Sequence, residues 1–165
     1  MSVNTEIERK YLIVRPAEEY LLTLSRTEIT QTYLKNESEG VTERVRKRGL
    51  DGKFVYTHTI KKRIDYMSSM EDESEISEEE YLLLLKRADT QMNTIFKTRA
   101  LIKEGGFTFE IDVYPFWSKQ AVMEVELPSE DAEFVLPETV TVLREVTGER
   151  AYSNARMARQ IPAED

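Results

Sequence analysis

Charged side chains occupy every second position in seven short stretches of this chain. In the first stretch, EIERKY, the alternating residues are Glu6, Glu8 and Lys10. Successive side chains of a β-strand point to opposite faces of a sheet, so these three charged groups would share one face. The other stretches repeat this spacing, some with basic residues and some with acidic ones. Their members are Arg44, Arg46 and Arg48; Lys61 and Arg63; Lys97, Arg99 and Lys103; Glu71, Glu73 and Glu75; Glu110 and Asp112; and Glu124 and Glu126.

For any single stretch, the simplest explanation is the water-facing side of a sheet, because antiparallel sheets commonly have one wet face. The set as a whole favours a binding site instead. Solvent faces usually mix neutral polar residues with charges of both signs, whereas here like charges stand two residues apart and repel each other. A ligand that compensates both the acidic and the basic strands would relieve that repulsion.

The residue types suit a chain of phosphates held together with divalent cations. Arginine binds phosphate bidentately through its planar fork. Oxygen ligands without imidazole or thiolate favour Mg²⁺ or Mn²⁺ over zinc, and the chain has one histidine, His58, and no cysteine. Mg²⁺ typically binds one or two carboxylates together with substrate phosphates. The sequence therefore predicts a phosphorylated small-molecule substrate with Mg²⁺ or Mn²⁺ as cofactor, and it excludes disulfides and cysteine nucleophiles.

The elements that position these residues are predicted to be mostly strands. Strands are expected at residues 5–13, 29–34, 41–49, 53–63, 70–76, 93–103, 106–114 and 119–127. Asp51-Gly52 and Gly105-Gly106 supply the positive φ of tight hairpin turns. Helices are expected at residues 16–24, 77–88, 129–136 and 153–161, the second of them starting with a capping box of Ser77 and Glu80.

Eight antiparallel strands can close into a barrel, in which one sheet face becomes a lumen. We therefore expect a mainly β (α+β) fold: a closed eight-stranded antiparallel barrel with peripheral helices on its apolar outer face. The 165 residues are expected to form a single domain, 1–165. A net charge of −8 argues against nucleic-acid and anionic-membrane partners. With no apolar targeting segment and no apolar run near ~20 residues, a cytoplasmic location is expected.

The chain opens with the motif ExExK, as EIERK at residues 6–10, and an ordered set of motifs follows it. These are QTYL at 31–34, ERVRKR at 43–48, TIKK at 59–62, ESEIS at 73–77, KTR at 97–99, FEIDVY at 109–114, VMEVELP at 122–128 and VTGERAYSNARMA at 146–158. ExExK alone occurs often by chance, but the set spans nearly the whole chain. It resembles the CYTH superfamily, the triphosphate tunnel metalloenzymes. The resemblance implies an eight-stranded barrel whose lumen binds triphosphate and divalent metal, and it is compatible with a homodimer.

The resemblance also implies a role for each matching position. The implied metal ligands are Glu6, Glu8, Asp112, Glu124 and Glu126. The implied phosphate-binding residues are Lys10, Arg44, Arg46, Lys61, Lys97 and Arg99. The implied catalytic group is Lys10, Arg46, Lys61, Glu73 and Glu75. Glu71 departs from the pattern, because many relatives carry an arginine two residues before the Glu73–Glu75 pair.

The function that the resemblance favours is metal-dependent hydrolysis of a triphosphate, with inorganic tripolyphosphate as the first substrate. Thiamine triphosphate and nucleoside triphosphates are alternative substrates. A class IV adenylyl cyclase, which makes cyclic AMP and pyrophosphate from ATP, is an alternative reaction, although no motif for a base and ribose pocket is present. A non-catalytic polyphosphate-binding module is a third alternative. The charges on one face oppose an apolar-ligand barrel.

Overall fold

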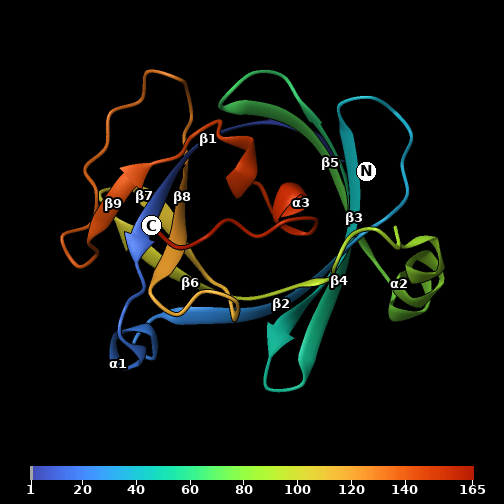
Figure 1. The fold of residues 1–165 in the computed structure, drawn as a ribbon, viewed down its shortest axis with the longest axis horizontal. Coiled ribbons are helices and arrows are strands. Elements are labelled where there is room, and N and C mark those ends of the chain that lie inside the picture. The colour runs from blue at the N-terminus through green and yellow to red at the C-terminus, as the bar shows by residue number, and fades with distance from the viewer. Residues whose placement is uncertain (1) are drawn as a thin grey trace.

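Eight antiparallel strands form a closed barrel in the computed structural model, which describes residues 2–165 and the side chains from residue 4 onward. Around the ring, the strands are β1 (Ser2–Val14), β5 (Ser68–Ile76), β4 (Lys53–Arg63), β3 (Val41–Leu50), β2 (Ser25–Tyr33), β6 (Ile95–Glu104), β7 (Phe107–Val113) and β8 (Gln120–Glu126). The barrel closes because β1 pairs with β5 along its first half and with β8 along its second half. The predicted barrel is confirmed (Figure 1).

The hairpin turns also agree with the sequence. Asp51 and Gly52 have φ of 54° and 79°, and Gly105 and Gly106 have φ of 62° and 82°. Positive φ at two consecutive residues is typical of the type I′ turn, whose twist matches that of the flanking strands. Each turn therefore fixes the register of the hairpin it closes, and with it the face on which every charged residue lies.

The helices are shorter than predicted and lie mainly outside the barrel. They are α1 (Glu18–Leu21), α2 (Glu78–Leu84) with its 3₁₀ extension η1 (Leu85–Arg87), η2 (Arg150–Tyr152) and α3 (Asn154–Met157). Ser77 caps α2 as predicted, since its hydroxyl accepts from the backbone N–H of Glu80 at 3.1 Å. None of the helices in the described part of the chain has the length and apolar character needed to cross a membrane.

The helix predicted at residues 129–136 is wrong. This segment is a turn followed by extended chain, in which Ala132, Phe134 and Leu136 pack against the outer core while the residues between them are exposed. Burial with a period of two suits extended chain rather than a helix. A short strand that the sequence did not predict, β9 (Val142–Glu145), follows and pairs with β1.

Apolar residues of the barrel wall alternate between two separate clusters. Outward-facing residues such as Ile13, Ile111 and Met123 form the outer cluster, which α1 and the extended segment cover. Val45, also outward-facing, packs under α2 with Tyr81. The predicted alternation of apolar outside and charged inside is therefore confirmed along these strands.

The second cluster fills one end of the barrel interior. It continues the inward-facing rows beyond the charged residues: Leu12 follows Lys10, Tyr114 follows Asp112, and Val122 precedes Glu124. The C-terminal segment completes this cluster with buried Tyr152, Met157 and Ala158. Figure 1 shows α3 inside the ring of strands, whereas α2 lies outside it. One end of the barrel is thus closed by packed apolar side chains, and the charged residues occupy the rest of the interior.

Candidate active site

A cavity of about 450 Å³ occupies the charged part of the barrel interior. It brings together side chains that the sequence placed on five different strands. The predicted residues that line it are Glu8, Lys10, Arg44, Arg46, Lys61, Arg99 and Glu124. The rest of the wall comes from α3 and the chain before it, from the connections between β2 and β3 and between β4 and β5, and from the chain after η1.

Arg44 and Arg46 form a buried basic wall on β3, with exposed fractions of 8% and 7%. The Nε of Arg46 donates to the side-chain carbonyl of Gln31 on β2. No carboxylate lies within ion-pair distance of Arg46, and the buried Nε of Arg44 has no hydrogen-bond partner among the described residues. Burial and the neighbouring charges of Arg44 and Arg99 lower the pKa of Arg46 to about 9. These guanidinium groups hold unused hydrogen-bond donors and excess positive charge beside the cavity.

Two lysines face the same space. The Nζ of Lys10 lies 3.1 Å from Glu124 and donates to the backbone carbonyl of Tyr152 at 3.2 Å. The Nζ of Lys61 lies 3.9 Å from Glu8 and 3.6 Å from Glu71. Lys61 is less buried than the two arginines, with 29% of its side chain exposed. Lys10 is thus held by short contacts with Glu124 and Tyr152, whereas the longer contacts of Lys61 leave its ammonium group freer to reorient toward an anion.

The acids of the interior occur in pairs. Repulsion from Glu124 and burial raise the pKa of Glu8 to about 7. Burial and contact with Glu71 raise the pKa of Glu6 to about 8. In contrast, burial would raise the pKa of Glu124, but the nearby charges of Lys10, Arg99 and Lys97 together outweigh it and lower that pKa to about 2. Each pair therefore holds a carboxyl group that becomes fully ionised only when a cation compensates the charge.

Such pairs fit a metal that is shared with the substrate better than a metal held by protein alone. Among residues 2–165, no group of three acids, histidines or cysteines stands close enough to hold a metal ion. Mg²⁺ commonly takes one or two carboxylates and completes its shell with substrate phosphates and water. The pair of Glu8 and Glu124 lines the cavity and meets this requirement.

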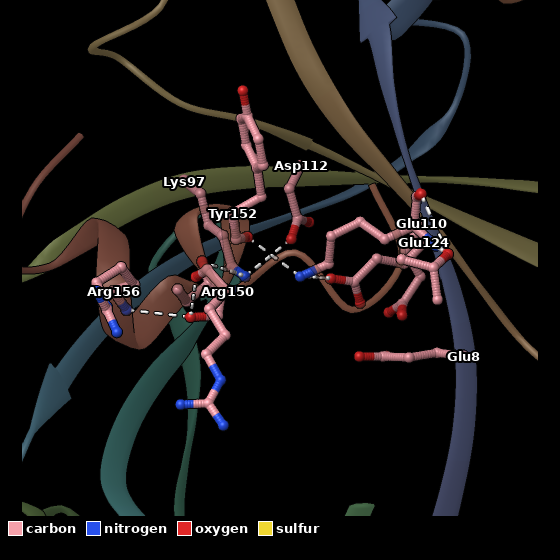
Figure 2. A network of polar contacts seen from close by, with 12 residues as sticks. Glu8, Lys97, Glu110, Asp112, Glu124, Arg150, Tyr152 and Arg156 are labelled. Carbon is pink, nitrogen blue, oxygen red and sulfur yellow. Dashed lines mark hydrogen bonds and ion pairs between the residues drawn. The ribbon is translucent and has the colours of Figure 1, made fainter. Parts of the chain in front are cut away.

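Asp112 belongs to a buried ion cluster, and Figure 2 shows it beside Lys97. Its two oxygens accept from Lys97 Nζ at 2.8 Å and from Arg99 Nε and Nη2 at 2.8 and 2.9 Å. Arg99 also pairs with Glu110 at 2.9 Å. Lys97 and Asp112 are 3% and 1% exposed and do not line the cavity. The sequence assigned Asp112 to metal and Lys97 to phosphate, whereas here each is occupied by the other.

Four other predicted residues also lie outside the cavity lining. Glu6 contacts Glu71 next to it, and Glu73 accepts a hydrogen bond from Thr59 at 2.8 Å. Glu75 and Glu126 are exposed near the ends of their strands. All four occupy sequence positions that alternate in step with the inward-facing residues of their strands. Along the barrel axis, however, they lie at a different height from the cavity.

Three residues to which the resemblance assigned no role also belong to the site. Glu71 is 8% exposed and lies 3.6 Å from both Arg44 and Lys61. Gln31 is fully buried and orients Arg46. Glu110 lines the cavity. The alternation of charges had already placed Glu71 and Glu110 on the charged face. Gln31, two residues before Tyr33 on the inward face of β2, carried no such signal.

Comparisons with known proteins agree with this geometry. No family model matches the chain. The chain is 31% identical over 160 residues to a protein of Nitrosomonas europaea named inorganic triphosphatase, covering 96% of this chain and 99% of that one. A crystal structure of an inorganic triphosphatase superposes with a TM-score of 0.60 at 30% identity, covering 96% and 97%. A crystal structure of a putative adenylate cyclase from Bacillus halodurans shares the fold, with a TM-score of 0.59 at 18% identity and coverage of 79% and 84%.

Proposed function

The chain belongs to the CYTH superfamily, the triphosphate tunnel metalloenzymes, and on that basis we propose that it is a divalent-metal-dependent triphosphatase that hydrolyses inorganic tripolyphosphate. The observation that carries the proposal is a buried basic wall with unused hydrogen-bond donors. Among the described residues, Arg46 is buried without a carboxylate partner, and Arg44, which lies 3.6 Å from Glu71, keeps an unused Nε donor, both beside a cavity. Buried cations without partners are costly unless an anion supplies the missing contacts. A polyphosphate chain provides several such contacts in a row.

The packing at the inner end of the barrel favours inorganic tripolyphosphate over a nucleotide or thiamine triphosphate. The inner end of the barrel is filled by Tyr114, Trp117 and Tyr152, which pack against one another. No room is left there for a base or a thiazolium ring, so any organic group would have to lie among the charged residues of the cavity. A substrate that consists of phosphates alone avoids that mismatch.

Mg²⁺ or Mn²⁺ would be held by Glu8 and Glu124, with Glu6, Glu110 and Glu126 close to that pair, and would neutralise phosphate charge and activate water. The protein groups supply the rest. Arg44 and Arg46 bind non-bridging oxygens, and their fixed positions stabilise the charge of the transferred phosphoryl group. Lys10 and Lys61 exchange their carboxylate partners for phosphate oxygens.

A buried ion cluster then orients the phosphate-binding groups of the site. It consists of Lys97, Asp112 and Arg99. Asp112 holds the guanidinium of Arg99 by two hydrogen bonds, which fixes the direction in which its remaining donors point. Because positioning and electrostatics dominate phosphoryl transfer, this fixed geometry contributes directly to rate. We therefore assign Asp112 a positioning role rather than metal ligation.

The test is a phosphate-release and product screen of the purified protein over tripolyphosphate, pyrophosphate, ATP and thiamine triphosphate, with Mg²⁺, Mn²⁺ or EDTA. We expect orthophosphate and pyrophosphate from tripolyphosphate, with slower release from the organic triphosphates. Cyclic AMP from ATP would identify a cyclase. Tight tripolyphosphate binding without turnover under any metal would identify a binding module.

A further inference from the structure

Two arginines of the C-terminal segment line the same cavity but play no part in the site described above. Arg150 lies in η2 and Arg156 in α3, and both are exposed. Tyr152 and Met157, between and beside them, are buried in the apolar end of the barrel with exposed fractions of 6% and 1%. The two arginines therefore project from a segment that is anchored to the barrel.

A hydroxyl group fixes the two arginines relative to each other. Ser153 Oγ donates to the carbonyl of Arg150 at 2.8 Å and accepts from the backbone N–H of Arg156 at 3.2 Å. Figure 2 shows the side chain of Arg150 extending away from Lys97 and Asp112. Both guanidinium groups thus start from positions set by buried anchors and a shared cap.

The acids around this part of the cavity are already engaged with other groups. Glu149 pairs with Arg144 at 3.0 Å, and Asp89 pairs with Arg159 at 3.4 Å. Asp65 accepts from the backbone N–H groups of residues 67 and 68 at 3.0 and 2.8 Å. Glu43 contacts His58 and Arg87.

No such partner serves the two arginines. Within the described part of the chain, no carboxylate lies within ion-pair distance of the guanidinium of Arg150 or Arg156. Their positive charge is therefore uncompensated where they line the cavity, unlike that of Arg159 beside them.

The cavity is also larger than tripolyphosphate requires. A volume of about 450 Å³ lies within the ~300–1,000 Å³ of pockets that hold drug-sized ligands, and tripolyphosphate is smaller than such ligands. The buried group of Arg44, Arg46, Lys10 and Lys61 already offers enough cations for a triphosphate. The exposed arginines extend that row of cations from the interior to the surface of the same cavity.

We propose that Arg150 and Arg156 form a second phosphate-binding group that receives the trailing phosphates of linear polyphosphate chains longer than tripolyphosphate. This inference rests on the proposed function, since it assumes that the buried group holds the phosphates that react. In this proposal the two arginines determine the preference for chain length. A chain of three phosphates held by the buried group makes little contact with them, whereas a longer chain reaches them.

The test compares kcat/KM for tripolyphosphate with kcat/KM for linear tetrapolyphosphate and a longer polyphosphate, in wild type and in a double variant, Arg150→Gln with Arg156→Gln. Two exposed charged contacts predict a loss of ~2- to 30-fold on the longer chains and a distinctly smaller loss on tripolyphosphate. Arg159→Gln is the matched control, because it removes a cation from the same cavity wall that Asp89 already neutralises. In this variant, the ratio of kcat/KM on the longer chains to kcat/KM on tripolyphosphate should equal that of wild type.

An equal loss on all chain lengths would overturn the inference, because it would indicate general attraction of anions. Unchanged kinetics in the double variant would overturn it as well. A wild-type protein that does not turn over tripolyphosphate would contradict the proposed function instead. In that case, calorimetric binding of the same chains decides the inference, which then requires tighter binding of the longer chains and loss of that preference in the double variant.

Discussion

Replacement of Arg46 by glutamine is expected to stabilise the ligand-free protein while abolishing triphosphate hydrolysis. Burial and the charges of Arg44 and Arg99 lower the pKa of Arg46 from the ordinary ~12.5 of arginine to about 9. At pH 7 the group is protonated in both the folded and the unfolded state, so the whole cost of holding the charge falls on the folded state. At ~1.4 kcal/mol for each pKa unit, that cost is about 5 kcal/mol.

Glutamine would remove the charge but not without loss. The hydrogen bond from Arg46 to Gln31 disappears, and a buried acceptor left without a donor costs ~1–3 kcal/mol. A net stabilisation of about 2 kcal/mol or more therefore remains. For a chain of this size, 1 kcal/mol corresponds to ~2–4 °C in Tm, so we expect Tm to rise by at least about 4–8 °C.

The assay is thermal unfolding in a buffer without phosphate, with EDTA, followed by the same melts at increasing tripolyphosphate. Wild type should gain stability as the ligand saturates it, by ~2.7 kcal/mol at a hundred times Kd. Arg46→Gln should gain much less, so the order of Tm values reverses with ligand. Steady-state kinetics with Mg²⁺ should show the loss of activity in the variant that melts higher.

The control is Arg9→Gln, which removes an arginine from the outer face, where it pairs with Glu145 at 2.6 Å and is 36% exposed. An exposed pair contributes ~0.2–1 kcal/mol, so this variant should melt at or slightly below wild type with full activity. A fall of several degrees for Arg46→Gln without ligand would refute the reasoning, because it would mean that Arg46 serves a structural ion pair. Retained turnover would refute its assignment to phosphate binding.

Three further outcomes are expected. Activity should vanish in excess EDTA and return with Mg²⁺ or Mn²⁺; full turnover with negligible metal content would contradict the carboxylate site. Without metal, urea melts should show stability falling as pH rises from about 5 to 8, because Glu6 and Glu8, with pKa values of about 8 and about 7, keep protons that the unfolded chain has lost. Glu8→Gln should flatten that slope and lower activity by orders of magnitude; an unchanged slope would show that Glu8 titrates normally. Asp112→Asn should destabilise the protein by ~3–5 kcal/mol, since it leaves Lys97 and Arg99 as buried charges without their partner; a wild-type Tm in EDTA would instead favour metal ligation.

The sequence alone was sufficient to predict the barrel and its charged interior. Alternation of charge and apolar residues has a period that only a strand can place on one face, and paired turn glycines set the registers. Glu8, Arg46 and Glu124 were therefore assigned correctly to the charged inward face, and the apolar residues next to such positions, such as Ile111 and Val125, lie in the outer core. The failed helix at residues 129–136 had a weaker signal, because a capping residue and a short apolar run also occur in extended chain that packs against a sheet.

Only the tertiary structure determined the level at which each inward-facing residue lies along the barrel. Strand tilt and stagger set that level, and neither leaves a period in the sequence. Asp112 and Glu124 have the same parity and charge, yet one is enclosed by Lys97 and Arg99 and the other faces the cavity. Glu75 and Glu126 share that parity but end up exposed.

The closed end of the barrel is the second feature that required the fold. Tyr152 and Met157 come from the last part of the chain, and they fill a space bounded by Leu12 and Tyr114 from distant strands. Local pattern indicates that such residues are apolar, but not which cavity they fill. The sequence therefore determined what chemistry the lumen could perform, and the three-dimensional packing determined where in the lumen that chemistry has room to occur.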